Sequence, residues 1–183
     1  MTPWIPALGM ALALAGAAGP GLAQAPADAL AESRAAHARR DYPRAVQLLL
    51  PLARAGNAGA QVRLGQMYYH GQGVKENDTE AFTWFQRAAL VGHAEGQFQL
   101  ANMYAFGFGV PRDETDPDRA AARWYFEAAR QEHPEAQYSL GILFFSGKGV
   151  VQSNEEALRW FRRAANHGHR DAQRFIDGHA GPR

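Results

Sequence analysis

The sequence predicts an all-α fold in which pairs of helices repeat along the chain as a solenoid. The first observation is a glutamine that recurs at positions 61, 97, 137 and 173, so that successive copies lie 36, 40 and 36 residues apart. The second is that the neighbours recur with it: Ala60-Gln61-Val62-Arg63-Leu64-Gly65 corresponds to Ala136-Gln137-Tyr138-Ser139-Leu140-Gly141. A fixed period of this length is typical of repeat solenoids. Such folds usually bind other molecules along an extended surface rather than enclose a reaction.

A single apolar stripe predicts the first helix of each unit. In the first full unit Ala60, Leu64 and Tyr68 are four residues apart and therefore lie on one helical face. The pair Gly71 and Gly73 then breaks the helix. Two glycines followed by a valine recur at corresponding places: Gly71/Gly73/Val74, Gly107/Gly109/Val110 and Gly147/Gly149/Val150.

The second helix of the unit is predicted to open at Asn77 and to end at Gly92. Glycine suits that end because a left-handed helix cap disfavours a β-carbon. Aromatic and alanine pairs recur in this helix: Trp84-Phe85 with Ala88-Ala89, Trp124-Tyr125 with Ala128-Ala129, and Trp160-Phe161 with Ala164-Ala165.

Capping residues support these boundaries. Asn77-Asp78-Thr79-Glu80 and Ser153-Asn154-Glu155-Glu156 both fit the capping box, in which two side chains satisfy free amides at a helix start. The middle unit has four extra residues within Pro111 to Arg119, which account for its longer step. There Asp116-Pro117 supplies a cap followed by a first-turn proline.

The recurring residues resemble a known family. Ala-x-x-x-Leu-Gly-x-x-Tyr, Gly-x-Gly-Val and Ala-x-x-Trp-Phe-x-x-Ala-Ala-x-x-Gly together are similar to the Sel-one-like repeat, a variant of the tetratricopeptide repeat, from about Ala58 to Gly168. The resemblance implies stacked antiparallel helix pairs in a right-handed α-α superhelix and an adaptor role in protein complexes. Bacterial members of this kind are often exported. Three positions depart from the pattern: Ala101 replaces the packing glycine, Phe144 the tyrosine and Glu132 the terminal glycine.

The chain therefore divides into a leader, a degenerate unit, three full units and a cap. Residues 1–23 are expected to be a signal peptide, and residues 24–57 a degenerate tetratricopeptide-like helix pair. The three Sel-one-like repeats are expected at 58–92, 93–132 and 133–168. Residues 169–183 would form a terminal capping helix and tail, as a solenoid needs at its end.

The leader is expected to direct export. The first 27 residues carry no Lys, Arg, Asp or Glu, and Ile5 to Ala18 is a hydrophobic segment. Helix breakers and small residues follow, so that cleavage is expected after Ala23. The alternative is that the segment stays uncleaved and anchors the chain in a membrane, since it approaches the roughly 20 residues of a span. A periplasmic or secreted protein is the expectation.

Composition excludes several chemistries. With no cysteine, the chain has no disulfide, thiolate metal site or cysteine nucleophile. A formal net charge of +1 argues against nucleic-acid binding, which normally shows a basic excess. The glycine pairs follow a helix rather than a strand, which favours a tight turn over a phosphate loop.

The histidines and acidic residues are interpreted as structural. His93, His133 and His169 occupy equivalent positions one helix pair apart, too far to share a metal ion. They are predicted to cap the C-terminus of the second helix or to interact with its dipole. Asp113 to Asp118 is interpreted as a solvated acidic loop. No cofactor, metal or catalytic residue is predicted.

Aromatic residues that the repeat does not require are the candidate binding site. They are Tyr69, Phe106, Phe108 and Phe145, whose counterparts in other units include Ala105, His70, Ser146, Gln72 and Lys148. Exposed aromatic clusters often mark binding patches, although packing beneath the long loop would also explain them.

The predicted function is a protein-interaction scaffold or adaptor in the bacterial cell envelope, with a protein or peptide partner. One alternative is an envelope-directed hydrolase acting on peptidoglycan or a β-lactam, since exported cysteine-rich relatives are linked to such activities. Their stapling cysteines are absent from this chain. Another alternative is a structural or self-associating element.

Overall fold

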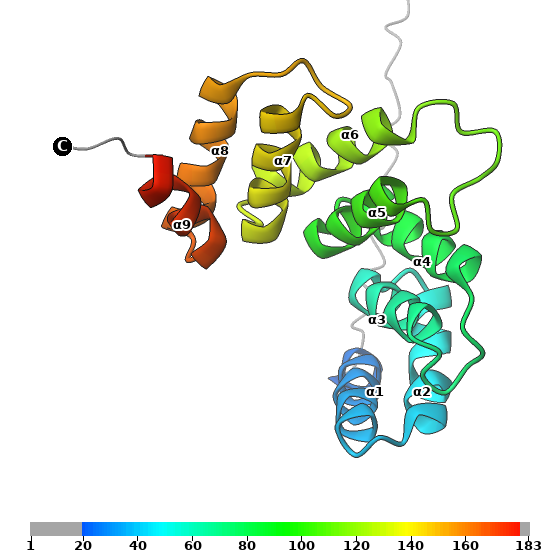
Figure 1. Cartoon of the computed structure of the whole chain (residues 1–183). Helices are drawn as coiled ribbons and strands as arrows, with labels where there is room; N and C mark the ends of the chain where they lie inside the picture. The colour runs from blue at the N-terminus through cyan, green and yellow to red at the C-terminus, as the bar shows by residue number, and fades with distance from the viewer. Residues whose placement is uncertain (1–19, 180–183) are drawn as a thin grey trace, which may run out of the picture.

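The computed structural model describes residues 20–179, with side chains from Asp28 onward. Over that range the chain is helical, with nine helices and no strand (Figure 1). The expected signal peptide, residues 1–23, lies almost entirely outside the described residues. The helices are α1 (Pro20–Ala38), α2 (Tyr42–Arg54), α3 (Ala58–Tyr69), α4 (Asp78–Leu90), α5 (Ala94–Phe106), α6 (Pro117–Arg130), α7 (Pro134–Ser146), α8 (Asn154–Asn166) and α9 (Arg170–His179).

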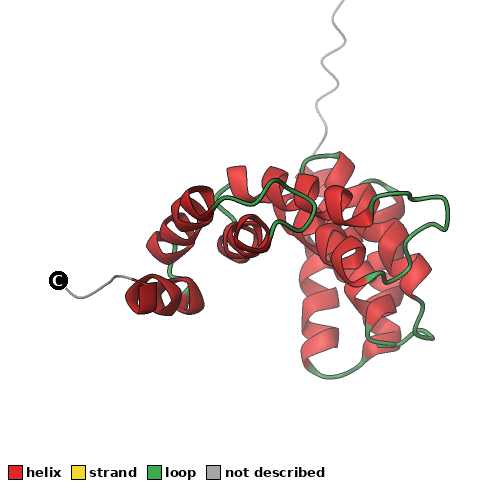
Figure 2. Cartoon of the chain, turned by 45° about the horizontal axis from the view of Figure 1, so that its top comes forward, coloured by secondary structure: helices red, strands yellow, loops and turns green. Residues whose placement is uncertain are grey.

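The helices form a curved solenoid, as the repeat predicts. Each helix packs on the next in sequence, and α3 also contacts α5 directly. Figure 1 shows the stack bending, with α1, α3, α5, α7 and α9 on the inside of the bend and α2, α4, α6 and α8 outside. The long connection between α5 and α6 projects beyond the helices (Figure 2). We call the side formed by the odd-numbered helices the inner face.

Small residues allow the two helices of a unit to approach closely. A β-carbon at Gly65 would lie 2.7 Å from the ring of Phe85, and one at Gly141 would lie 2.6 Å from the ring of Phe161. The corresponding residues of the middle unit are Ala101 and Tyr125, both buried. The hydroxyl of Tyr125 donates a hydrogen bond of 2.6 Å to Asn102, a contact that phenylalanine cannot make.

The recurring glutamines join consecutive units. The side-chain amides of Gln61, Gln97 and Gln137 are buried, and each donates to a carbonyl near the end of the preceding second helix. The acceptors are Ala53, Ala89 and Ala129, at 3.0, 3.3 and 3.1 Å. Gln173 is exposed and donates instead to Asp177. Three of the four glutamines are therefore structural bridges.

The side-chain carbonyl oxygens of two bridging glutamines accept from the end of their own unit's second helix. Gln131 donates to Gln97 Oε1 at 2.7 Å, and His167 Nδ1 donates to Gln137 Oε1 at 3.0 Å. The equivalent residue of the first full unit is Val91, which has no donor. Gln61 Oε1 is accordingly buried without a hydrogen bond from any described residue.

The second glycine of each loop is required by the preceding unit. Gly73 has a φ of 73°, and a β-carbon there would lie 2.6 Å from the carbonyl oxygen of Tyr42 in the first turn of α2. Gly109 and Gly149 meet Asp78 and Asp118 in the same way. Each loop therefore packs on the start of the second helix of the preceding unit, in addition to forming the tight turn that the sequence predicts.

The capping-box prediction is half right. Asn77 Oδ1 accepts from the amide of Glu80 at 3.1 Å, and Ser153 Oγ accepts from the amide of Glu156 at 3.2 Å. The reciprocal bonds from the glutamates are replaced, because the amide of Asn77 donates to the carbonyl of Tyr68 at 3.0 Å. The amide of Ser153 likewise donates to the carbonyl of Phe144.

The histidine prediction is wrong about which helix is capped. His93, His133 and His169 are N-caps of α5, α7 and α9, and each ring Nδ1 accepts from a backbone amide at 3.3 Å. Asn57, their counterpart before α3, caps in the same manner. The physical reason is that each connection is so short that the last residue after one helix already caps the next.

His133 also connects neighbouring units. Its Nε2 lies 2.9 Å from Glu95 Oε2, and its ring stacks on Phe98 with centroids 4.7 Å apart. The hydrogen bond from His133 lowers the pKa of Glu95, outweighing burial, which raises it. His169 stacks on Tyr138 in the equivalent arrangement, with centroids 4.2 Å apart.

We predict that Gly141→Ala destabilises the fold by about 1–3 kcal/mol, because the added methyl group overpacks against Phe161. Chemical denaturation measures the change. Gly59→Ala is the matched control, since a β-carbon there meets only Asn57 Oδ1 at an ordinary 3.5 Å. Equal stability of the two variants would contradict the packing role of Gly141.

We predict that Val91→Gln stabilises the fold by about 1 kcal/mol, because it supplies the missing donor to Gln61 Oε1. Leu90→Gln is the control, since Leu90 and Val91 are similarly exposed, at 69% and 67%. Both changes remove an exposed apolar side chain, but only Val91 occupies the position of Gln131 and His167. An equal rise of the urea midpoint in both variants would contradict a hydrogen bond between the new Gln at position 91 and Gln61 Oε1.

Candidate functional site

Three of the four predicted aromatic residues surround one small cavity at the inner face, between α3 and α5. The cavity has a volume of about 170 Å³. We call it the aromatic cavity; its lining residues are Tyr69, Phe85, Gln99, Asn102, Met103, Phe106 and Phe108.

The end of α5 fixes the two phenylalanines. Gly107 adopts the left-handed conformation, with φ 74°, and the amide of Phe108 donates to the carbonyl of Met103 at 2.9 Å. This glycine-based helix stop reverses the chain directly after Phe106. The rings of Phe106 and Phe108 consequently face each other with centroids 6.1 Å apart.

Tyr69 completes the aromatic wall from the neighbouring unit. Its ring meets Phe108 edge to face, with centroids 5.8 Å apart. Phe106 is 69% exposed and Phe108 39% exposed, so neither ring is closed off by the long loop that follows. Gln99 and Asn102 add polar groups to the apolar lining. Asn102 Oδ1 accepts from Tyr125, and Gln99 Nε2 donates to Glu95 at 2.7 Å. The arrangement can hold an apolar side chain while the Nδ2 of Asn102 and the Oε1 of Gln99 bind polar backbone groups beside it.

Phe145 lies elsewhere. Its ring packs edge to face on Phe175 of α9, with centroids 5.4 Å apart, and lies 6.3 Å from the ring of His179. Phe175 in turn packs on the buried Phe161, with centroids 4.2 Å apart. The structure therefore gives Phe145 a packing contact with the last helix and does not bring it to the aromatic cavity.

A second cavity of the inner face was not predicted from the sequence. It lies between α1 and α3 and has a volume of about 300 Å³. We call it the α1–α3 cavity; it is lined by Ser33, His37, Leu49, Arg63, Gln66, Met67, His70 and Gln72. His37 and Gln72 close one side through a hydrogen bond of 3.0 Å. The only sequence signal was that Arg63 and His70 vary between units.

The acidic loop borders a third, more open cavity of about 620 Å³ beside α6. Its apolar lining includes Phe126, Phe144 and Val150. The carboxylates are occupied in shaping the loop: Asp116 accepts from the amide of Arg119 at 3.0 Å, and Glu114 accepts from the amide of Asp116 at 3.1 Å. Such backbone contacts are those of helix and turn caps.

Across residues 20–179 no group of three or more histidine and acidic side chains is placed to hold a metal ion. None of the helices in that range is both long and apolar enough to cross a bilayer.

The repeats match a known family model. The model, described as Sel1 repeat, matches residues 33–57, 58–93, 94–133 and 134–169. The chain belongs to the Sel1 repeat family. The resemblance seen in the recurring residues is thereby confirmed. Sel1 repeat proteins are in general scaffolds that bind other proteins.

Solved Sel1 repeat structures share the fold. A Sel1 repeat protein from Oxalobacter formigenes is 33% identical, with a TM-score of 0.71, over 79% of this chain and 56% of that one. The protective antigen c5321 of uropathogenic Escherichia coli, which displays an SLR fold, is 30% identical, with a TM-score of 0.67, over 72% of this chain and 27% of that one. This chain therefore spans about half and about a quarter of their lengths.

Helicobacter pylori cysteine rich protein B shares the fold alone, at 23% identity and a TM-score of 0.57 over 74% of this chain and 94% of that one. Among curated proteins, none matches the chain.

Proposed function

We propose that this Sel1 repeat protein is an exported adaptor that holds a segment of a partner protein on its inner face in the bacterial cell envelope. The aromatic cavity carries the proposal. Tyr69, Phe106 and Phe108 come from two units and converge on one hollow, although the repeat requires none of them.

Exposure distinguishes Phe106 and Phe108 from core residues, while Tyr69 is half-buried beside them. The recurring aromatics Phe85 and Phe161 are buried between helices, at 2% and 0% exposure. Phe106 is 69% exposed, so folding removes little of its apolar surface from water. Partly exposed aromatic residues around a pocket are the usual anchors of protein interfaces.

The position on the inner face favours an extended segment as the partner. Stacked repeats bind along a curved surface that several units share. Gln99 and Asn102 follow Arg63 and Gln66 by one unit on the same helical face. Amide side chains at such positions can donate to and accept from a peptide backbone.

The proposed location depends on the leader. Its uncharged first 27 residues support export, with cleavage after Ala23 and release into the periplasm or medium. Retention of the segment would instead tether the same inner face to a membrane. Adaptor function is compatible with both.

We propose no enzymatic activity. The hydrolase alternative receives no support, because Glu114 and Asp116 hold backbone amides at the start of α6. The family match also concerns a scaffold repeat.

Replacing Phe106 and Phe108 by serine is expected to weaken capture of a partner from envelope extract by about tenfold or more, as loss of a hot-spot pair does. The thermal midpoint should change little, because both rings are partly solvated and the pair contributes about 1 kcal/mol to folding. Quantitative pull-down and differential scanning calorimetry provide the two measurements.

Val151→Ser is the matched control, since Val151 is an apolar residue 87% exposed in the α7–α8 loop. Equal capture by the wild type, the double variant and Val151→Ser would contradict the proposal. A large loss of stability in the double variant would show that the rings belong to the core. A defined oligomer that captures nothing would favour the self-associating alternative.

A further inference from the structure

The α1–α3 cavity is positively charged and has no acidic residue in its lining. Arg63 is the charged residue of its wall, beside the imidazole rings of His37 and His70 and the neutral amides of Gln66 and Gln72. Ser33 is buried, and its hydroxyl donates to the carbonyl of Leu30 at 2.8 Å. Among the lining residues, Arg63 is the one whose side chain carries a permanent positive charge.

Arg63 is an uncompensated cation. It is half-buried, and it forms no ion pair with any described residue. Among the arginines of residues 28–179 it is the one that is not exposed, whereas Arg44 and Arg159 form their ion pairs at exposed positions. Burial lowers the pKa of Arg63, and repulsion from Arg34 lowers it further. Partly desolvated cations are normally paired, so this one lacks the anion that its surroundings favour.

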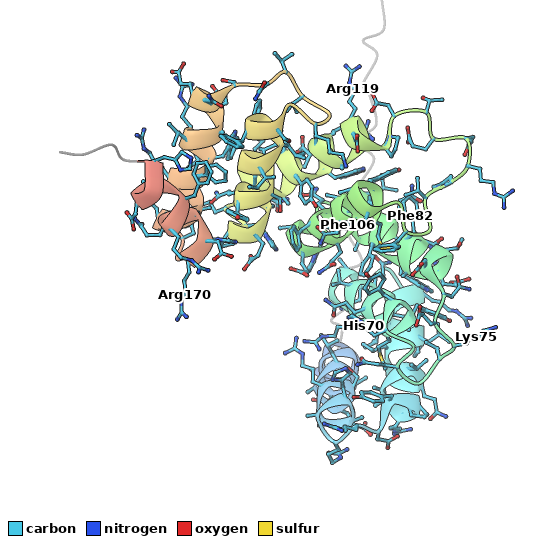
Figure 3. The ribbon with its side chains drawn as sticks, in the orientation of Figure 1. His70, Lys75, Phe82, Phe106, Arg119 and Arg170 are labelled. Atoms are coloured by element: carbon cyan, nitrogen blue, oxygen red, sulfur yellow. The ribbon has the colours of Figure 1, made fainter. Side chains whose placement is uncertain are left out.

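The charged and aromatic cavities are neighbours on the same face. His70 directly after α3 and Phe106 at the end of α5 occupy equivalent positions of successive units, 36 residues apart. Figure 3 shows them on adjacent levels of the stack. Met67 lines the first cavity and its equivalent Met103 lines the second, so a segment lying along the inner face passes both.

We propose that the α1–α3 cavity binds a carboxylate of the same partner segment, so that the inner face recognises an acidic peptide with an apolar anchor. This inference rests on the proposed function. The apolar side chain enters the aromatic cavity, and an aspartate, glutamate or C-terminal carboxylate pairs with Arg63.

Charge complementarity and size select a peptide. The guanidinium has a planar array of donors that fits a carboxylate. Gln66 and Gln72 offer neutral amides nearby, and a volume of about 300 Å³ exceeds what a single small anion fills. A polyanion such as nucleic acid would need a wider basic surface than a chain of formal net charge +1 provides.

Selection from a random peptide library tests the inference on the full-length chain. Wild-type protein is expected to enrich sequences that combine acidic residues with an aromatic or large aliphatic residue. Arg63→Gln should keep the apolar preference and lose the acidic one. An enriched acidic peptide should bind Arg63→Gln about tenfold or more weakly than wild type, because a charge-assisted contact is lost.

Arg162→Gln is the matched control, an exposed arginine on α8 and outside the inner face. Enrichment of neutral or basic peptides, or equal acidic preference in Arg63→Gln, would overturn the inference while leaving the proposed function standing. Displacement of the acidic peptide by inorganic phosphate, but not by acetate at equal ionic strength, would identify a phosphate site and also overturn it. Enrichment that survives Phe106→Ser unchanged would instead contradict the proposed function.

Discussion

A buried glutamine amide between the ends of successive second helices determines how the units of this solenoid stack. Gln97 donates to the carbonyl of Ala89 at the end of α4 and accepts from Gln131 at the end of α6. Gln137 makes the same bridge between Ala129 and His167. Because an unpaired buried amide costs about 1–3 kcal/mol, only a narrow range of positions between units is acceptable. The docking of the glycine loops on the preceding unit depends on that stacking.

The same constraint separates scaffold from binding surface. Bridging amides, alanine pairs and capping histidines use the residues that recur, and these point between helices. The side chains that vary are left on the inner face, where neighbouring helices place them together. Arg63 from α3, His70 directly after it and Phe106 from α5 become neighbours in this way, producing one charged and one aromatic cavity side by side. Recognition is thus assigned to residues that the stacking does not need.

Local periodicity was enough to predict the helices. The pattern placed the second helix of the first full unit between Asn77 and Gly92, and α4 runs from Asp78 to Leu90 with Asn77 as its cap. The histidines were misassigned because they follow one helix and precede another. Asn57, a good N-cap residue at the equivalent position, was the signal that could have decided it.

The site depended on contacts that sequence spacing does not contain. Phe145 and Tyr69 are equivalent in the repeat. Phe145 packs on Phe175 of the last helix, α9, whereas Tyr69 packs on Phe108 beside the aromatic cavity. The different neighbours give the two residues different roles. The α1–α3 cavity is completed by Ser33, His37 and Leu49 of the degenerate unit, whose few recurring residues leave that part of the wall without an alignment. Only three-dimensional packing shows that Arg63 lacks a partner.

Denaturation of Gln97→Met tests most directly whether the buried amide bridges hold the units together. Methionine has nearly the same length but cannot bond to Ala89 or Gln131. The account predicts a loss of about 1–3 kcal/mol in the free energy of unfolding. It predicts almost no loss for Gln173→Met, because Gln173 is the exposed member of the series. Equal stability of Gln97→Met, Gln173→Met and wild type would contradict it.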